Sequence, residues 1–262
     1  MRNADRSQDD PMAGARAWHH DAQAMVCDVI EPWAHGTVAR ATRYPSYWDY
    51  NVVRVERDPG SGADLLESFA DEALAGLAHR RVDVELIEVA QSLRGGFERT
   101  GWLAMRLLWM RHEAERTAVA DARVTEVPYD AVNDLRIAWH REDFPDQETT
   151  GYFSQAREVA QLRRARVLAM HEDGVPVAFT QFVADGERAE ITHVFVHPEH
   201  RGEGRGTAIT RAAIATAGGA KDLWICADDE DRPKHLYARL GFRPVWTNMQ
   251  FTRLPGAAPR RA

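Results

Sequence analysis

The chain has 262 residues, of which 44% are hydrophobic and 28% are charged, and its formal net charge is −7. This composition indicates a globular protein with one large domain or two small ones, and the negative charge disfavours a nucleic-acid-binding surface. The two cysteines, Cys27 and Cys226, match neither a zinc-binding spacing nor a disulfide framework. Because the sequence also has no 18-residue apolar run and no signal-like N-terminus, we expect a cytoplasmic protein without a membrane span.

The first half of the sequence predicts alternating strands and helices. Residues 1–20 are polar and lack periodicity, so they are expected to form a disordered tail. Apolar residues that alternate, or that run together, predict strands at 36–42, 48–55, 82–87 and 101–110. Apolar residues at helical spacing predict helices at 22–33, 64–78 and 89–100, the last of them broken at Gly95 and Gly96.

The second half, from about residue 122, repeats this outline. Strands are predicted at 122–127, 165–171, 176–183, 189–196, 222–227 and 244–254. Helices are predicted at 129–140, 152–161, 207–217 and 232–240. The segment 97–102, followed by Met110, is similar to the segment 236–242, followed by Met249. We therefore expect a duplicated domain, with copies at 21–115 and 122–255 and a tail at 256–262.

Residues 189–207 carry the most informative pattern in the chain. An alternating strand through Val196 precedes a glycine-rich turn at 201–206, and a helical pattern starts at Thr207. A strand, a glycine turn and a helix together present free backbone N–H groups to a phosphate, so a nucleotide-containing cofactor is expected here. The turn lacks the Gly-Lys-Ser/Thr of a P-loop, and no acidic residue at a suitable distance supports a dinucleotide-binding fingerprint.

Two motifs resemble those of the GNAT superfamily of N-acetyltransferases. The segment from Val196 to Gly206, VHPEHRGEGRG, resembles its signature for the acetyl-CoA pyrophosphate, and Leu236 to Phe242, LYARLGF, resembles its second signature, LYxxLGF. The resemblance covers residues 122–254 well and the first half only faintly, because the first half has no RxxGxG turn. It implies an α/β (α+β) fold with a mixed, mostly antiparallel sheet, flanked by helices and splayed open in a V after the strand that precedes the glycine turn.

The resemblance also implies acetyl-CoA as co-substrate, and it implies no metal. Backbone N–H groups from Gly202 to Thr207 would hold the pyrophosphate, a stretch that includes Glu203, Gly204, Arg205 and Gly206. The backbones of Val194, Phe195 and Val196 would pair with the pantetheine amides in the manner of an added strand. Arg201 and Arg205 either add positive charge beside the phosphates or remain solvated at the surface.

Acyl transfer to an amine needs a base for the amine proton and an acid for the leaving thiolate. Tyr237 matches the tyrosine that often protonates the CoA sulfur in the family, or else it is a packed aromatic residue. Glu190 matches a position where some members carry the base, or else it is an exposed edge carboxylate. His193 has a more suitable ordinary pKa. Strand alternation, however, predicts that its side chain faces away from Glu190, whereas Val194 and Val196 share the side of Glu190.

The leading functional hypothesis is an N-acetyltransferase that acts on a primary amine of a small molecule. Acidic residues in the predicted loop 140–150 mildly favour a cationic acceptor. One alternative keeps the fold but uses a longer acyl-CoA or an aminoacyl-tRNA as donor, an option that the arginines at 163, 164 and 166 leave open. Another is a non-catalytic CoA-binding regulatory module. DNA and membrane partners are not expected, and the chain is predicted to be a monomer or a homodimer.

Overall fold

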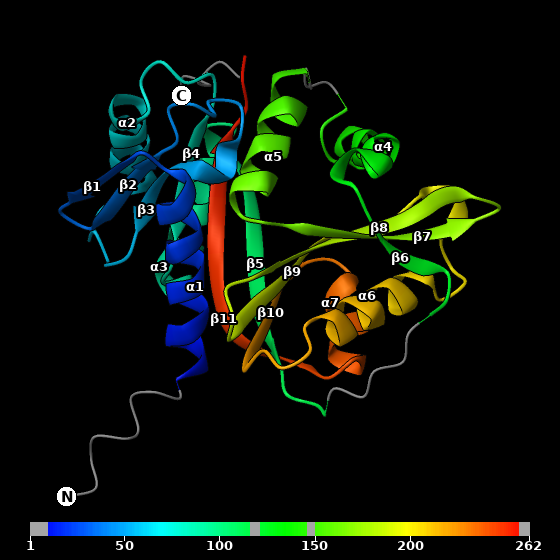
Figure 1. Ribbon diagram of the computed structural model, residues 1–262. Coiled ribbons are helices and arrows are strands. Elements are labelled where there is room, and N and C mark those ends of the chain that lie inside the picture. The colour runs from blue at the N-terminus through cyan, green and yellow to red at the C-terminus, as the bar shows by residue number, and fades with distance from the viewer. Residues whose placement is uncertain (1–9, 116–120, 146–149, 257–262) are drawn as a thin grey trace, which may run out of the picture. The chain divides into compact units, whose positions relative to one another are not determined.

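The computed structural model describes residues 10–115, 121–145 and 150–256, which divide into two compact units (Figure 1). The described residues of unit 1 lie within 1–109, 227–232 and 244–262, and those of unit 2 lie within 110–226 and 233–243. The division passes through three strands, which are β5 (Leu103–His112), β10 (Asp222–Asp228) and β11 (Phe242–Arg253). In the part of the chain that the structure describes, no helix combines the length and the hydrophobicity needed to cross a membrane.

Unit 1 is built on neighbouring strands in the order β1-β2-β3-β4-β11. The first four are β1 (Val29–Trp33), β2 (Gly36–Arg40), β3 (Asn51–Val55) and β4 (Arg80–Val84). Strands β1, β2 and β3 are antiparallel, β3 and β4 are parallel, and β11 runs antiparallel to β4. In sequence, a 3₁₀ turn (Trp48–Tyr50) precedes β3, α2 (Ala63–Ala73) joins β3 to β4, and α3 (Ile87–Arg99) joins β4 to β5.

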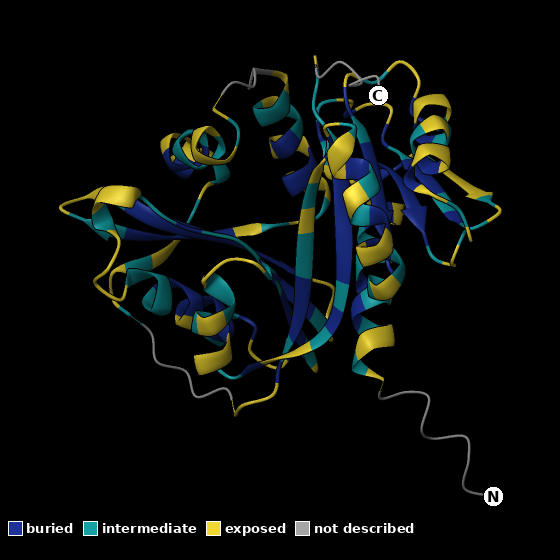
Figure 2. Ribbon diagram, turned by 180° about the vertical axis from the view of Figure 1, so that it is seen from behind, coloured by how far each residue is buried: buried dark blue, intermediate teal, exposed yellow. Residues whose placement is uncertain are grey.

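One face of this sheet packs against α2 and α3 through an apolar core. Alternate residues of β3, β4 and β11 meet buried residues of the two helices, and the rings of Phe97 and Phe251 stack with centroids 4.2 Å apart. Figure 2 shows the central strands as mostly buried, while the helices carry exposed residues. Helix α3 runs unbroken through Gly95 and Gly96, contrary to the prediction from sequence. A Cβ at Gly96 would lie 2.6 Å from that of Ala63, so this glycine permits the close approach of two helices.

The N-terminal segment corrects one prediction. Residues 11–20, predicted to be a disordered tail, belong to helix α1 (Pro11–Val26), and the segment 22–33 is not one helix, because β1 follows α1. Asp10 caps α1 by accepting a hydrogen bond from the backbone N–H of Met12, and Pro11 occupies the first turn, where a proline is tolerated. Trp18 is buried in the folded unit.

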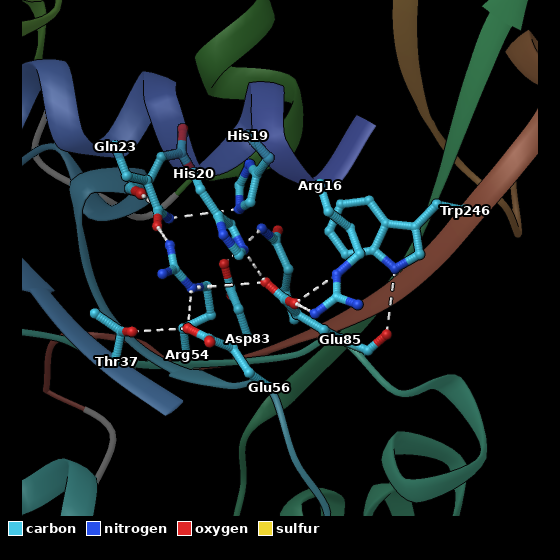
Figure 3. A network of polar contacts seen from close by, with 12 residues as sticks. Arg16, His19, His20, Gln23, Thr37, Arg54, Glu56, Asp83, Glu85 and Trp246 are labelled. Atoms are coloured by element: carbon cyan, nitrogen blue, oxygen red, sulfur yellow. Dashed lines mark hydrogen bonds and ion pairs between the residues drawn. The ribbon is translucent and has the colours of Figure 1, made fainter. Parts of the chain in front are cut away.

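Helix α1 is fastened to the other face of the sheet by a buried polar network (Figure 3). Glu85, just after β4, has a side chain that is 1% exposed, and it accepts hydrogen bonds from Arg16 Nε and Nη2 at 2.9 and 2.5 Å. Its second carboxylate oxygen lies 2.5 Å from His20 Nε2, and Arg54 donates to Gln23 at 2.6 Å. Arg16, His20 and Gln23 therefore face the sheet, although such polar residues suggested a solvated tail.

Unit 2 is built on strands in the order β6-β7-β8-β9-β10. They include β6 (Val124–Val127), β7 (Arg166–Glu172), β8 (Val175–Ala184) and β9 (Arg188–Val196), which form antiparallel neighbours, while β9 and β10 are parallel. Its helices are α4 (Asn133–Asp143), α5 (Thr150–Leu162), α6 (Arg205–Thr216) and α7 (Pro233–Arg239), with 3₁₀ turns at Tyr129–Val132 and Pro198–His200. A mixed, mostly antiparallel sheet flanked by helices was predicted, and the structure confirms it.

The two halves of the sequence contain the same succession of elements. The first half contains β1-β2-β3-α2-β4-α3-β5 and the second half contains β7-β8-β9-α6-β10-α7-β11, with antiparallel hairpins followed by a parallel pair in each. Gly101 (φ +86°) follows α3 as Gly241 (φ +97°) follows α7. That the two halves are copies of one domain stays a prediction.

Candidate active site

The parallel strands β9 and β10 are paired only along the first part of β9. Their register runs from Arg188 opposite Asp222 to Ile191 opposite Ile225, and β9 then continues to Val196, still paired with β8. In unit 1 the corresponding pair stays together to the end of β3, where Glu85 donates its backbone N–H to the carbonyl of Val55. Of these two described parallel pairs, the one in unit 2 therefore leaves the edge of β9 beyond the pairing, and an extended ligand can add to that edge.

A β-bulge in β9 changes which side chains share a face. Gln181 pairs with Thr192 and Phe179 pairs with Phe195, so Thr180 alone faces the two residues between them, and His193 takes a left-handed φ of +51°. Side chains that are directly opposite in a sheet lie on the same face. Thr192 and Phe195 therefore share a face although they are three residues apart.

The bulge overturns the side-chain directions expected from strict alternation. Glu190 lies two residues before Thr192 and so shares its face, and the ring of His193 lies 5.0 Å from that of Trp139 in α4, on the same side. Val196 points the other way, since its Cγ2 would be 3.8 Å from a Cβ at Gly206 in α6. The prediction that Glu190 shares a face with Val194 and Val196, and not with His193, is wrong.

The glycine turn leads into α6 with unsatisfied backbone donors. Gly204, with φ +77°, is the N-cap of α6 and supplies no side-chain cap. Its carbonyl accepts a hydrogen bond from the backbone N–H of Ala208. The backbone N–H groups of Arg205, Gly206 and Thr207 lie in the first turn of α6, so they have no acceptor within the helix. The helix dipole adds positive potential at this end of α6. A Cβ at Gly202 or Gly204 would meet no atom within 4 Å, so both glycines are needed for their positive φ and leave open space beside the backbone.

The two arginines of the turn are engaged by carboxylates. Arg201 donates to both oxygens of Glu142 and, through Nε, to the carbonyl of Val196. The Arg201 hydrogen bonds hold the pKa of Glu142 below its usual range. Arg205 is 10% exposed and donates to both oxygens of Glu172 at 2.6 and 2.9 Å. Neither arginine is simply solvated, and phosphate contact would require each to share or leave its carboxylate partner.

Glu190 and His193 lie in one charged cluster between β9 and the helices. Glu190 Oε2 accepts from Arg163 Nη2 at 3.2 Å, with side chains 10% and 12% exposed. Desolvation, helped by the charges of Arg136 and Arg163, lowers the pKa of His193 to about 3. His193 is therefore neutral at physiological pH, and its Nδ1 lies 3.0 Å from the hydroxyl of Thr192. Glu190 is a buried, paired carboxylate and not an exposed edge residue.

Tyr237 lies in α7, is 6% exposed, and contacts the ring of Phe242 at a centroid distance of 6.2 Å. Gly241, the glycine of the motif LYARLGF, has φ +97°, and a Cβ there would lie 2.5 Å from the Cβ of Ala114. The motif therefore combines a buried phenol with a helix end that only glycine can form.

The helices α4 and α5 line a small pocket and an aromatic cluster. The pocket has a volume of about 230 Å³, and an ion pair between Asp130 and Arg157 at 2.7 Å forms part of its wall. His140 contacts three aromatic rings, those of Phe144, Tyr152 and Phe153, at centroid distances of 4.9 to 5.6 Å. Of the acidic loop predicted here, residues 146–149 lie outside the described residues.

We compared the sequence with protein families and the structure with solved structures. The sequence model of the Acetyltransferase (GNAT) family matches residues 131–242, whereas no curated protein matches the chain. Among solved structures, the chain is similar to a functionally unknown conserved protein from Staphylococcus epidermidis ATCC 12228, with 13% identity, a TM-score of 0.66, and coverage of 88% of this chain and 95% of that chain. It is also similar to a GCN5-related N-acetyltransferase from Kribbella flavida, with 19% identity, a TM-score of 0.57, and coverage of 92% and 95%.

The TM-scores show a shared fold, and the family match gives the class of the matched residues. Residues 131–242 form an acetyltransferase domain of the GNAT family, which confirms the resemblance found in the two motifs. The family match makes this domain an acyltransferase domain.

The structure brings together most of the predicted site residues of unit 2 and adds others. Glu190, His193 and the glycine turn lie on or beside β9, as their closeness in sequence suggests. Arg163, Glu142 and Glu172 contact these residues but were not predicted as partners, because they are 27 to 59 residues away in sequence. The arginine patch suggested for tRNA is partly neutralised, since Arg163 pairs with Glu190 and Arg166 with Glu126.

Proposed function

We propose that this chain transfers an acetyl group from acetyl-CoA to a primary amine of a small molecule, by direct attack in a ternary complex. The observation that best supports this proposal is that β9 extends beyond its pairing with β10 and is followed by the helix α6, whose N-terminus has no side-chain cap. The N–H groups around Gly204 suit a pyrophosphate, and the edge of β9 from Val194 to Val196, which lies beyond the pairing with β10, suits the amides of pantetheine. Neither Cys27 nor Cys226 is in a disulfide, which agrees with an action in the cytoplasm.

Two side chains are proposed to move protons during the transfer. As the amine nitrogen bonds to the thioester carbon, Glu190 accepts the proton that the nitrogen loses, directly or through one water. As the carbon–sulfur bond breaks, Tyr237 donates its hydroxyl proton to the leaving thiolate. His193 is a poor base, because a group with a pKa of about 3 binds protons too weakly at neutral pH.

A thiol-release assay tests this proposal. The chain is incubated with acetyl-CoA, or with longer acyl-CoAs, and with amino acids, polyamines, aminoglycosides and peptides, and the acylated product is identified by mass spectrometry. Amine-dependent thiol release with acetyl-CoA is expected. CoA binding without release across the whole panel would instead support a non-catalytic binding module, and faster release with a longer chain would change the donor.

A further inference from the structure

Arg205 is held differently from Arg201, although both belong to the glycine turn. Its side chain is 10% exposed, whereas that of Arg201 is 47% exposed. Its Nε and Nη2 donate to the two oxygens of Glu172, and its Nη1 donates to the backbone carbonyl of His200 at 2.9 Å. Nη2 also lies 3.0 Å from a carboxylate oxygen of Glu203. All three guanidinium nitrogens of this largely buried side chain are therefore engaged within the protein.

Glu172 is a firmly placed partner for this side chain. It is the last residue of β7, and the two residues of the turn that follows, 173–174, have φ values of +50° and +81°, as a tight two-residue hairpin requires. Its carboxylate also lies 3.3 Å from Nδ1 of His200 and 3.8 Å from Arg123. The hydrogen bonds of Arg205 hold the pKa of Glu172 below its usual range, so the pair is ionic at neutral pH.

The contacts of Arg205 join the two ends of the glycine turn. Residues 201–204 lie outside helices and strands, between the 3₁₀ turn that ends at His200 and the helix α6 that begins at Arg205. The backbone of Arg205 belongs to α6, while its side chain reaches back to the carbonyl of His200. The ion pair with Glu172 attaches both ends of the turn to the hairpin of β7 and β8. This one side chain thus restrains the segment whose N–H groups precede α6.

An anion site made of backbone N–H groups depends on where those groups lie, because a hydrogen bond weakens steeply as its angle departs from linearity. From this geometry we infer that Arg205 is a positioning residue of the donor site, which keeps the glycine turn in shape through Glu172 and His200 and does not itself contact the phosphates. The inference rests on the proposed binding of the acetyl-CoA pyrophosphate by this turn.

The variant Glu172→Gln separates these two possible roles of Arg205 by the sign of its effect. If Arg205 were a phosphate ligand restrained by Glu172, the variant would release it and tighten acetyl-CoA binding. If Arg205 shapes the turn, the variant loosens the turn and weakens binding. Because the loss of a negative charge by itself favours an anionic ligand, weaker binding by Glu172→Gln would come from the altered turn.

Isothermal titration calorimetry with acetyl-CoA tests the inference. In Glu172→Gln and Arg205→Met the Kd should rise about tenfold or more, as expected when one hydrogen bond to a charged group is lost. Arg205→Lys should also weaken binding, because an ammonium group cannot form the forked contact of a guanidinium. The matched control is Glu126→Gln, which breaks a forked pair with Arg166 on β7 and should bind like the wild type.

The stoichiometry of the same titration distinguishes positioning from a merely structural role. A role in stability alone would lower the fraction of protein that binds and leave the Kd unchanged, whereas the inference predicts a raised Kd at wild-type stoichiometry. An unchanged Kd with a lowered stoichiometry in Arg205→Met would therefore overturn the inference.

Two further results would contradict a positioning role. One is tighter or unchanged binding by Glu172→Gln, a nearly isosteric change that carries the test if Arg205→Met does not fold. The other is wild-type binding by Arg205→Lys, which would show that the charge alone suffices. A wild type that binds no acetyl-CoA is a distinguishable result, because it would remove the proposed function itself and the inference with it.

Discussion

Arg201 donates from its two terminal guanidinium nitrogens to the two carboxylate oxygens of Glu142, over distances of 2.8 and 2.7 Å. This pair links the end of α4 to the glycine turn before α6. Both side chains are roughly half exposed, so the pair contributes modestly to stability, about 0.2 to 1 kcal/mol. Its main consequence concerns the charge near the turn, because Glu142 neutralises Arg201, an arginine of the turn that is proposed to hold the pyrophosphate.

Glu142→Gln should therefore bind acetyl-CoA more tightly than the wild type, by up to about fivefold, which is the pair energy expressed as an equilibrium ratio. Isothermal titration calorimetry at low salt measures this change. The matched control is Glu126→Gln, which breaks a similarly exposed pair with Arg166 on β7. Equal or weaker acetyl-CoA binding by Glu142→Gln would show that Arg201 does not reach the phosphates.

Tyr237→Phe should lower kcat by about 100-fold or more, since general acid catalysis typically contributes that much, while the Kd of acetyl-CoA should change little. Single-turnover kinetics separates the chemical step from product release. Tyr152→Phe serves as a control, because Tyr152 belongs to the aromatic cluster around His140. A kcat like that of the wild type would remove Tyr237 from the mechanism and leave it as a packed aromatic residue.

His79 predicts how the stability of unit 1 depends on pH. Burial lowers its pKa to about 4, and its ring stacks on that of Trp48 with centroids 5.3 Å apart. In the unfolded chain this histidine has an ordinary pKa of about 6.5, so it binds a proton as the pH falls below 6.5. In the folded chain it binds the proton only near pH 4. The contribution to the free energy of unfolding is therefore fully present above pH 6.5 and falls by about 3 kcal/mol in total between pH 6.5 and 4.

Denaturant unfolding at pH 7 and pH 5 measures this loss. The difference between the two pH values should shrink in His79→Asn by about 2 kcal/mol and stay unchanged in His235→Asn, which replaces an exposed histidine. The same difference in the wild type and in His79→Asn would contradict a neutral, buried His79.

Glu85→Gln should destabilise the chain by about 3 to 5 kcal/mol, because it leaves Arg16 without its carboxylate in the buried network under α1 (Figure 3). Glu56→Gln is the matched control, since Glu56 also pairs with an arginine but is 25% exposed and should cost less. Equilibrium unfolding followed by circular dichroism measures both. Similar losses in the two variants would mean that burial does not distinguish these carboxylates.

The sequence predicts the part of the site that depends on local chemistry. The strand, the glycine turn and the start of α6 follow from residues that are adjacent in the chain, so their pattern is complete in the printed sequence. The bulge at His193 could not be predicted in the same way, because no glycine or proline marks it and its register depends on the pairing with β8. A shift of one residue was enough to reverse the predicted direction of Glu190 relative to Val196.

Contacts between distant parts of the chain were missed for a related reason. The pairing of Arg163 with Glu190 arises only when the residue after α5 approaches β9, and nothing in the run of arginines distinguishes the buried member from the exposed one. Helix α1 was missed because Arg16, His20 and Gln23 resemble a solvated surface, whereas they meet buried partners on the sheet. Asp10 and Pro11 were the available signal, as an N-cap and a first-turn proline.

The most direct test of the central claim is acetyl-CoA binding and amine-dependent thiol release in a matched pair of glycine variants. Gly204→Asp places a carboxylate among the N–H groups before α6, and Gly60→Asp makes the same change in the turn before α2, where φ is +61° and no atom lies within 4 Å of the new Cβ. Both variants should lose about 1 to 2 kcal/mol of stability, because both require a left-handed conformation of a residue with a side chain. Only Gly204→Asp should lose acetyl-CoA binding and thiol release, whereas wild-type binding and release in Gly204→Asp would contradict the claim that this turn holds the donor.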